Sequence, residues 1–326
     1  MNIAENIYQM RIPIPDNPLG YINTYLIKSD EGSILVDTGW NTEEAFNSLR
    51  DRMNSYGVNF SDLKYIFITH IHPDHYGLVG RIDKFTDAKL IIHKNDKDLL
   101  NSRYIQTEDL VDDMTEWLRI NGVPEEEQTY FSRSSLSILG YIDVAMPDLV
   151  VNGGEKITLG DNDFEIIWTP GHSSGHICLY EKNQKSLFAG DHILEKISPN
   201  ISMNNQTVNN PLVDYMNSLN LMKKLEVDRV LPGHGKVFSS FSARIDQLLI
   251  HHENRLIEML ENFQGEPLTA YQIAVRTTWF LPWEKLPPFS KRVAVTETLA
   301  HLELLMTRGS LSKKQKAGIM YYFQPE

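Results

Sequence analysis

The chain is organised around residues Tyr65–Gly80, which read YIFITHIHPDHYGLVG. An apolar run ends at a cluster of His70, His72, Asp74 and His75, so three of the 11 histidines fall within six residues. Imidazole nitrogens and carboxylate oxygens are the ligand types that bind zinc and similar first-row metals. The proline inside the cluster cannot continue a β-ladder, so the chain must turn there. These residues favour two adjacent metal sites over scattered surface histidines.

Length and composition are those of a globular protein. At 326 residues the chain is long enough for a full hydrophobic core and for more than one domain. We expect no membrane span, because no run approaches about 18 consecutive apolar residues. We expect no signal peptide, because the N-terminus lacks a basic segment before an apolar core. The single cysteine, Cys178, lies in an apolar run and is expected to be a buried, inert thiol, which makes a cytoplasmic location the default.

The chain before the quoted stretch is predicted to be an antiparallel meander of three strands, at residues 6–12, 21–28 and 33–37. The meander ends at Asp37-Thr38-Gly39, where a carboxylate leaves a strand for a loop. For Asp37, a supporting role beside the metal ligands and the role of a plain turn residue are both open.

The same pattern, an apolar strand that ends in a turn carrying histidine or aspartate, occurs three more times. These turns are Pro170-Gly171-His172, Gly190-Asp191-His192 and Pro232-Gly233-His234. His172 sits at its turn, where a metal ligand is expected, and His176 is interpreted as a hydrogen-bonding residue near the ligands. One such dipeptide alone is a weak signal, but four in this order favour a common site.

The motifs Thr-His-Ile-His-Pro-Asp-His, Pro-Gly-His-Ser, Gly-Asp and Pro-Gly-His-Gly together resemble those of the metallo-β-lactamase superfamily of hydrolases. The chain looks most similar to the glyoxalase II-like branch. The resemblance covers about residues 6–240 and implies an α/β fold, a four-layer αββα sandwich with metals at one edge. It also implies two divalent ions, with zinc as the first choice, although manganese or iron can occupy similar sites. By similarity, one metal would be held by His70, His72 and His172, the second by Asp74, His75 and His234, with Asp191 as the bridge and Asp37 as support for the ligand loop.

One segment departs from that branch. Glyoxalase II-like members often carry a Gly-Gly pair after the Asp-His pair, and this chain has Tyr76-Gly77-Leu78 instead. The departure leaves the ligands intact and argues against the glyoxalase II substrate. The resemblance implies that two metals lower the pKa of a shared water towards about 7. The metal-bridging hydroxide would then cleave a small ester, thioester or lactone, with Asp74 as the catalytic residue that orients it.

Two further regions surround this predicted core. Residues 95–148 contain helix-like pieces without a ligand-rich motif, and we interpret them as an insertion in a catalytic domain of residues 1–240. A lid over the site and an ordinary connecting α-hairpin are both open for this insertion. Residues 241–326 are predicted to form three helices and a β-hairpin. This resembles the small C-terminal winged-helix domain attached to some β-lactamase-like hydrolases, some of which act on RNA.

Charge helps to separate the functional alternatives. The formal net charge is -12, and residues 241–326 hold ten Lys/Arg against nine Asp/Glu. A nucleic-acid enzyme spreads positive charge along its substrate path, so this balance favours a small-molecule substrate and no membrane partner. The first alternative is a metal-dependent endoribonuclease or phosphodiesterase, and the second is a non-enzymatic winged-helix regulator. The C-terminal residues could also pack on the core, shape the pocket or form a homodimer contact.

Overall fold

The computed structural model describes residues 1–15, 17–107, 109–134, 136–207 and 209–325. Its first β-sheet contains seven strands, and each strand pairs with the next one along the chain. They are β1 (Asn2–Ala4), β2 (Ile7–Pro13), β3 (Tyr21–Ser29), β4 (Gly32–Val36), β5 (Leu63–Phe67), β6 (Lys89–His93) and β7 (Leu149–Val151). Neighbours from β1 to β4 are antiparallel, as the predicted meander requires, and neighbours from β4 to β7 are parallel.

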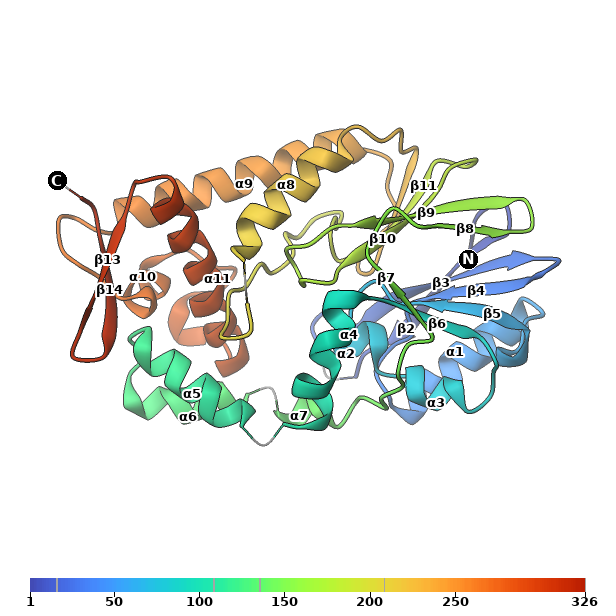
Figure 1. The fold of residues 1–326 in the computed structure, drawn as a ribbon, viewed down its shortest axis with the longest axis horizontal. Coiled ribbons are helices and arrows are strands. Elements are labelled where there is room, and N and C mark those ends of the chain that lie inside the picture. Colours follow the sequence, from blue (N-terminus) through green and yellow to red (C-terminus); the bar gives the residue numbers. More distant parts are fainter. Residues whose placement is uncertain (16, 108, 135, 208, 326) are drawn as a thin grey trace.

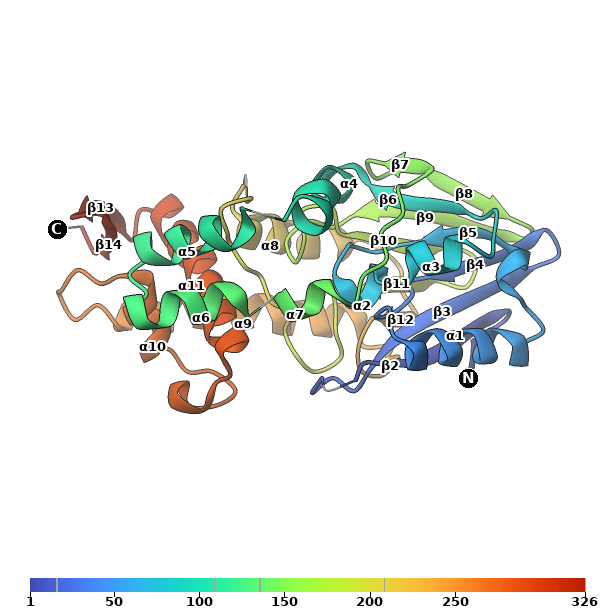
Figure 2. The same cartoon turned by 90° about the horizontal axis from the view of Figure 1, so that it is seen from below.

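The second sheet has five strands and stacks on the first, as Figures 1 and 2 show. In spatial order they are β12 (Arg229–Pro232), β11 (Ser186–Gly190), β10 (Ile177–Glu181), β9 (Asn162–Trp168) and β8 (Lys156–Leu159). All neighbours are antiparallel except β11 and β12, which run parallel. The mixed sandwich predicted from the resemblance is therefore confirmed.

Strand β10 illustrates why these apolar runs become covered strands. Side chains alternate between the two faces of a strand. Ile177 and Leu179 accordingly join the core between the sheets, whereas Cys178 and Tyr180 join the core under the outer helices. Burial raises the pKa of the Cys178 thiol to about 12, so the thiol stays protonated and inert, as predicted.

Helices cover the outer face of the first sheet. They are α1 (Glu43–Ser55), the short 3₁₀ helix η1 (Phe60–Asp62), α2 (Pro73–Tyr76) and α3 (Val79–Asp83). The α1 stripe of Phe46, Leu49 and Met53 is buried against this face. The Thr42 hydroxyl caps α1 by accepting a hydrogen bond from the backbone N–H of Ala45 at 3.1 Å. Helix spacing and a polar cap thus produce the layer that covers β2 to β6.

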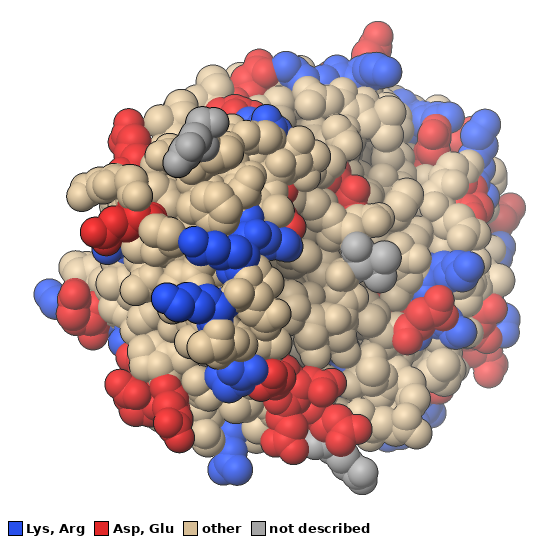
Figure 3. All heavy atoms as spheres, turned by 60° about the vertical axis from the view of Figure 1, so that its left-hand side comes forward, with Lys and Arg blue, Asp and Glu red and all other residues tan. Residues whose placement is uncertain are grey.

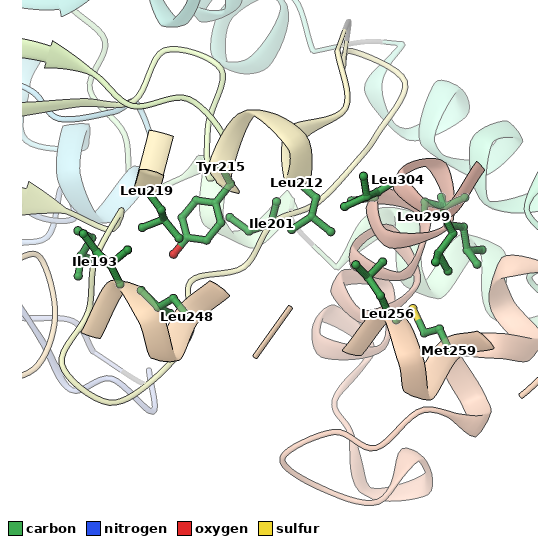
Figure 4. Close-up of a cluster of buried hydrophobic side chains, with 14 of the residues drawn as sticks. Ile193, Ile201, Leu212, Tyr215, Leu219, Leu248, Leu256, Met259, Leu299 and Leu304 are labelled. Carbon is green, nitrogen blue, oxygen red and sulfur yellow. The ribbon is translucent and has the colours of Figure 1, made fainter. Parts of the chain in front are cut away.

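Helices α8 (Pro211–Met222) and α9 (Phe241–Glu261) cover the outer face of the second sheet, and the other C-terminal elements continue beyond the sandwich (Figure 1). These other elements are α10 (Ala270–Arg276), the 3₁₀ helix η3 (Trp283–Lys285), α11 (Pro288–Thr307) and the hairpin β13 (Ser312–Lys316)–β14 (Ile319–Phe323). One buried cluster runs through α8, α9 and α11, from Ile193 and Leu219 beside the sandwich to Leu299 and Leu304 (Figure 4). Among the described helices, none is long and apolar enough to cross a membrane.

The insertion after β6 is helical, as predicted, and its far part lies beside the C-terminal helices. It comprises α4 (Lys94–Leu100), the π-helix η2 (Asn101–Ile105), α5 (Leu110–Ile120), α6 (Glu125–Arg133) and α7 (Leu136–Leu139). Helices α5 and α6 pack against each other, and they contact β14 and α11 respectively (Figures 1 and 2). The Tyr271 hydroxyl donates a hydrogen bond to the Glu127 carboxylate at 3.0 Å across this contact.

Helix α11 carries a buried carboxyl that makes stability depend on pH. Burial raises the pKa of Glu297 to about 7, against a partial lowering by Arg255. An exposed Glu titrates near about 4.3. The unfolded chain therefore loses this proton at lower pH than the folded chain, and the free energy of unfolding falls as pH rises from about 4.3 to 7.

Ionised Glu297 is expected to lower the free energy of unfolding by about 4 kcal/mol at pH 8 and by almost nothing at pH 4, and we expect Glu297→Gln to remove this loss. Thermal unfolding of both proteins at the two pH values measures the difference. An equal change in Tm at pH 4 and pH 8 would contradict the assignment.

Candidate metal centre

The four turns predicted to carry metal ligands meet at one edge of the sandwich. They follow the ends of β5, β9, β11 and β12. Strands pin the backbone on one side of each turn, so the histidine and aspartate side chains are held in place rather than carried on free loops. The seven predicted ligand residues are all brought together here: His70, His72, Asp74, His75, His172, Asp191 and His234.

The first group consists of three imidazoles. The Nδ1 atom of His72 lies 2.9 Å from the Nε2 atom of His70 and 2.9 Å from the Nε2 atom of His172. Burial lowers the pKa of all three, and it lowers those of His70 and His72 well below the ordinary value. At neutral pH the three rings are therefore uncharged and offer lone pairs, which is the form that binds a metal.

The second group lies beside the first and adds carboxylates. The Asp74 Oδ2 atom is 3.1 Å from the Nε2 atom of His234 and 3.9 Å from the Nε2 atom of His75. Asp191 lies between the two groups. Its Oδ1 atom is 3.5 Å from His75 Nε2, and its Oδ2 atom is 3.7 Å from His172 Nε2 and 3.6 Å from His234 Nε2.

Two buried polar atoms test whether these residues fit metal ions. Among the described residues, His75 Nε2 and Asp191 Oδ1 have no hydrogen-bond partner. An unsatisfied buried polar atom is costly, and a cation between them would satisfy both. Gly233 keeps this space open, because a Cβ atom there would lie 2.6 Å from Asp191 Oδ1 and 2.7 Å from the His75 ring. The residues therefore fit a pair of divalent ions held by nitrogen and oxygen ligands.

The charges of the second group depend on one another. Burial alone would lower the pKa of His75, but the carboxylates of Asp37, Asp191 and Asp74 together raise it well above the ordinary value. Burial alone would raise the pKa of Asp191, but His234, His75 and His172 hold it well below the ordinary value. The acidic groups thus stay ionised. The positive charge of protonated imidazole balances them, and a metal cation can supply that charge instead.

Backbone carbonyls fix the orientation of two candidate ligands. The Nδ1 atom of His172 lies 2.8 Å from the carbonyl oxygen of Asn200, and the Nδ1 atom of His234 lies 3.2 Å from that of Tyr21. A carbonyl can only accept, so each Nδ1 carries a proton and each Nε2 faces the centre. Burial lowers the pKa of His172, so its Nε2 keeps a lone pair. Burial alone would lower the pKa of His234 as well, but Asp191 and Asp74 raise it, and its Nε2 would lose a proton on binding a metal.

Asp37 and His176 lie directly behind the candidate ligands. Asp37 Oδ1 accepts the backbone N–H of Thr69 at 2.8 Å, and Asp37 Oδ2 is 2.8 Å from His75 Nδ1. His176 Nε2 accepts the backbone N–H of Asp191 at 3.1 Å. Both residues thus contact candidate ligand residues from behind. Asp37 contacts the ring of His75 and the backbone of Thr69 in addition to lying in its own turn.

We expect Asp37→Ala to weaken metal binding by about 10- to 100-fold, because it frees the ring that Asp37 orients. Competition against a chromophoric chelator measures the affinity. Asp37→Asn is the matched variant, because its amide oxygen can still accept one of these hydrogen bonds, and it should lose less. Unchanged affinity in Asp37→Ala would contradict the orienting role.

Two supporting residues were not predicted from the sequence. The Asp96 carboxylate accepts the backbone N–H groups of Ile71 and Gly175, each at 2.9 Å, and so joins two ligand loops. The Thr69 hydroxyl lies within 3.1 Å of both Asp37 and the Nδ1 atom of His70. Asp96 sits in the charged helix α4, where sequence gives no sign of burial. Thr69 directly precedes His70, the first predicted ligand, and this position was the one feature of the sequence that could have indicated its supporting role.

Comparison with known proteins agrees with this fold. Residues 17–234 match the family model described as the metallo-beta-lactamase superfamily, and the chain belongs to that superfamily of hydrolases. It is 26% identical over 330 residues to the probable metallo-hydrolase YqjP of Bacillus subtilis (strain 168), with 98% of each chain covered. It is 27% identical over 231 residues to the bovine acyl-coenzyme A thioesterase MBLAC2, covering 68% of this chain and 74% of that protein. A crystal structure of a metallo-beta-lactamase family protein from Thermus thermophilus superimposes with a TM-score of 0.84 at 29% identity, over 99% of both chains.

Proposed function

We propose that the protein is a metal-dependent hydrolase that cleaves a small thioester, ester or lactone, with zinc as its first-choice metal. The observation that carries the proposal is the convergence of His70 Nε2, His72 Nδ1 and His172 Nε2 beside the unsatisfied atoms of His75 and Asp191. Such a donor set suits two adjacent divalent ions.

The proposed ligand assignment follows the two groups. The first ion would be held by His70, His72 and His172, the second by Asp74, His75 and His234, and Asp191 would contact both. Two ions so held supply a water with a pKa lowered towards about 7 and a positive charge that polarises the substrate oxygen.

The chain's own groups would orient the reaction. Asp74 lies at the mouth of the second group, with its Oδ2 atom 3.1 Å from His234 Nε2. Its carboxylate can accept a hydrogen bond from the attacking water and hold that proton for the leaving group. Asp37 keeps the His75 ring in place behind it. No serine or cysteine nucleophile is needed for this chemistry, and the buried Cys178 takes no part.

The relatives favour a thioester within this class of substrates. The bovine and human relatives that share 27% and 26% identity over 231 residues bear the name acyl-coenzyme A thioesterase. We propose that its reaction is like that of the glyoxalase II-like hydrolases, in which water attacks a carbonyl carbon that is not part of a β-lactam ring. Its single buried cysteine supports a cytoplasmic location.

The alternative substrate is a phosphodiester or RNA, which a winged-helix domain at residues 241–326 would help to bind. The three C-terminal helices and the β13–β14 hairpin have the order that such a domain requires. However, Lys313 at the hairpin is paired with Glu303 at 2.6 Å. On the face drawn in Figure 3, Lys and Arg occur in small groups that alternate with Asp and Glu. Both observations favour a packing role for this predicted domain.

A paired substrate panel tests the proposal. One half holds thioesters, aryl esters and lactones, and the other holds a bis-aryl phosphodiester and a short single-stranded RNA. We expect the metal-loaded protein to cleave carbonyl substrates, thioesters best, and to leave RNA intact. Cleavage of RNA that is lost on chelation, with no turnover of carbonyl substrates, would overturn the proposal in favour of the alternative.

A further inference from the structure

A cavity of about 710 Å³ lies beside the metal centre, between the sandwich and the C-terminal helices. Its wall comes from residues 18–19, residues 196–200, helices α9 and α11, and the segment 279–290. The volume falls within the range of small-molecule sites, which is about 300 to 1,000 Å³. The sequence carries no motif for this cavity, because its wall is assembled from distant parts of the chain.

The cavity wall is connected to the metal centre through backbone. Asn200 lines the cavity, and its carbonyl oxygen holds His172 Nδ1 at 2.8 Å. Leu19 lines the cavity two residues before Tyr21, whose carbonyl faces His234. The cavity wall therefore includes a residue that holds the candidate ligand His172, and it reaches within two residues of the one that holds His234.

Large apolar side chains around the cavity remain exposed to solvent. Leu19 is 40% exposed, Ile197 50%, Phe280 77% and Phe289 41%, and these residues come from three separate segments. Exposed apolar side chains around a pocket indicate a binding site for an apolar ligand.

Two arginines that line the cavity are engaged in holding its wall together, whereas Lys196, which also lines it, is exposed to solvent. Arg244 donates to the carbonyl oxygens of Leu194 at 2.7 Å and Ile197 at 2.8 Å. Arg255 pairs with Glu258 at 2.9 Å and donates to the carbonyl oxygen of Thr278. Both arginines thus fix loops, and an anionic ligand would have to compete for them.

The carboxyl group among the lining residues, Glu297, is only partly ionised near neutral pH. Burial raises its pKa to about 7. Apolar side chains, engaged arginines and a carboxyl that is partly neutral together suit an uncharged occupant, and the exposed Lys196 is the charged side chain that such an occupant would leave in solvent.

We propose that this cavity binds the uncharged alkyl chain of the acyl group whose carbonyl is cleaved at the metal centre. The inference rests on the proposed function. It adds that the protein selects its substrate by the alkyl chain of the acyl group. Val293 on α11 and Phe280 become residues that determine specificity. The phosphate-bearing part of a coenzyme thioester, if present, would remain outside the cavity.

The test compares acetyl, butyryl, hexanoyl and octanoyl thioesters of N-acetylcysteamine. Burial of each methylene contributes at most about a fourfold gain. We expect kcat/KM to rise at least about 100-fold from acetyl to octanoyl, mainly through a lower KM.

Val293→Phe, which fills the cavity, should reduce the octanoyl-to-acetyl ratio of kcat/KM by at least about tenfold, close to the loss of two buried methylenes. Val275→Phe is the matched control, because Val275 lies on α10 outside the cavity lining and is 37% exposed. It should keep the wild-type ratio. Phe280→Ala removes a side chain that is 77% exposed, so the fold should be unaffected, and it should raise KM for octanoyl thioester alone.

Binding of 2-decanone, an uncharged chain without a hydrolysable bond, gives a readout independent of turnover. Calorimetry should show binding to wild type and Val275→Phe and weaker binding to Val293→Phe. Equal kcat/KM for all thioesters, unchanged by Val293→Phe, would overturn the cavity assignment while the proposed function stands. No turnover of thioesters, aryl esters or lactones, with 2-decanone still bound, would overturn both the proposed function and the acyl occupant.

Discussion

Replacing Asp191 by alanine is expected to remove metal from both groups and to reduce hydrolysis to the uncatalysed background. The Asp191 carboxylate lies 3.5 to 3.7 Å from ligand atoms of His75, His172 and His234, so it contacts both groups. Its removal would leave the imidazoles without the negative charge that offsets two cations. Elemental analysis of the purified variant, with turnover on the same sample, measures the effect.

The matched control for this experiment is Asp161→Ala, because Asp161 is an exposed residue of the turn between β8 and β9. It should keep wild-type metal content and turnover. His72→Ala should behave like Asp191→Ala at the first group, because its Nδ1 atom joins the other two imidazoles. Full metal content and normal turnover in either site variant would contradict the ligand assignment.

Replacing Asp74 by asparagine is expected to lower kcat by about 10²- to 10⁴-fold, the usual contribution of a positioned general base. Asparagine keeps the size of the side chain and one oxygen, but it cannot take a proton from water. The loss should appear in kcat more than in KM, because the proton moves only in the transition state. Steady-state kinetics with metal held in excess separates this effect from weaker metal binding.

Asp161→Asn serves as the control for the same chemical change at a surface position. It should leave kcat unchanged. A normal kcat in Asp74→Asn under saturating metal would show that another group handles the proton, and it would leave Asp74 as a ligand alone.

Sequence was informative where ligands follow strands directly. The recurring strand-end turns with His70, His172, Asp191 and His234 favoured a common site, and the family resemblance implied that this site lies at one edge of the sandwich. The position of Asp37 directly after β4 left its role open between a turn residue and a supporting residue, and the resemblance favoured the supporting role. These positions depend on local structure, and local structure is what periodicity and turn residues reveal.

Sequence was uninformative where distant segments meet. Asp96 joins two ligand loops from a helix that reads as an ordinary charged surface helix. Helix α8 was not predicted, although Asn210 caps it and Pro211 occupies its first turn. The cavity beside the metal centre combines segments from both ends of the chain. Such contacts are set by tertiary packing, which no local pattern specifies.

The C-terminal helices also show a limit of predicting domains from element order. Their sequence of three helices and a hairpin is present, but Leu256, Met259 and Leu299 share one buried cluster with Ile193 and Tyr215 of the preceding region (Figure 4). Apolar spacing identified the helices, whereas their shared core appears only in three dimensions. This packing joins the C-terminal residues to the core of the preceding region.

Stepwise reconstitution tests the central claim, a two-metal hydrolase, most directly. Protein stripped with a chelator would be titrated with zinc while metal content and thioester turnover are followed together. The account predicts that turnover is absent without metal and reaches its maximum as two ions bind per chain, with Asp191→Ala inactive throughout. Full turnover in the stripped protein would contradict it.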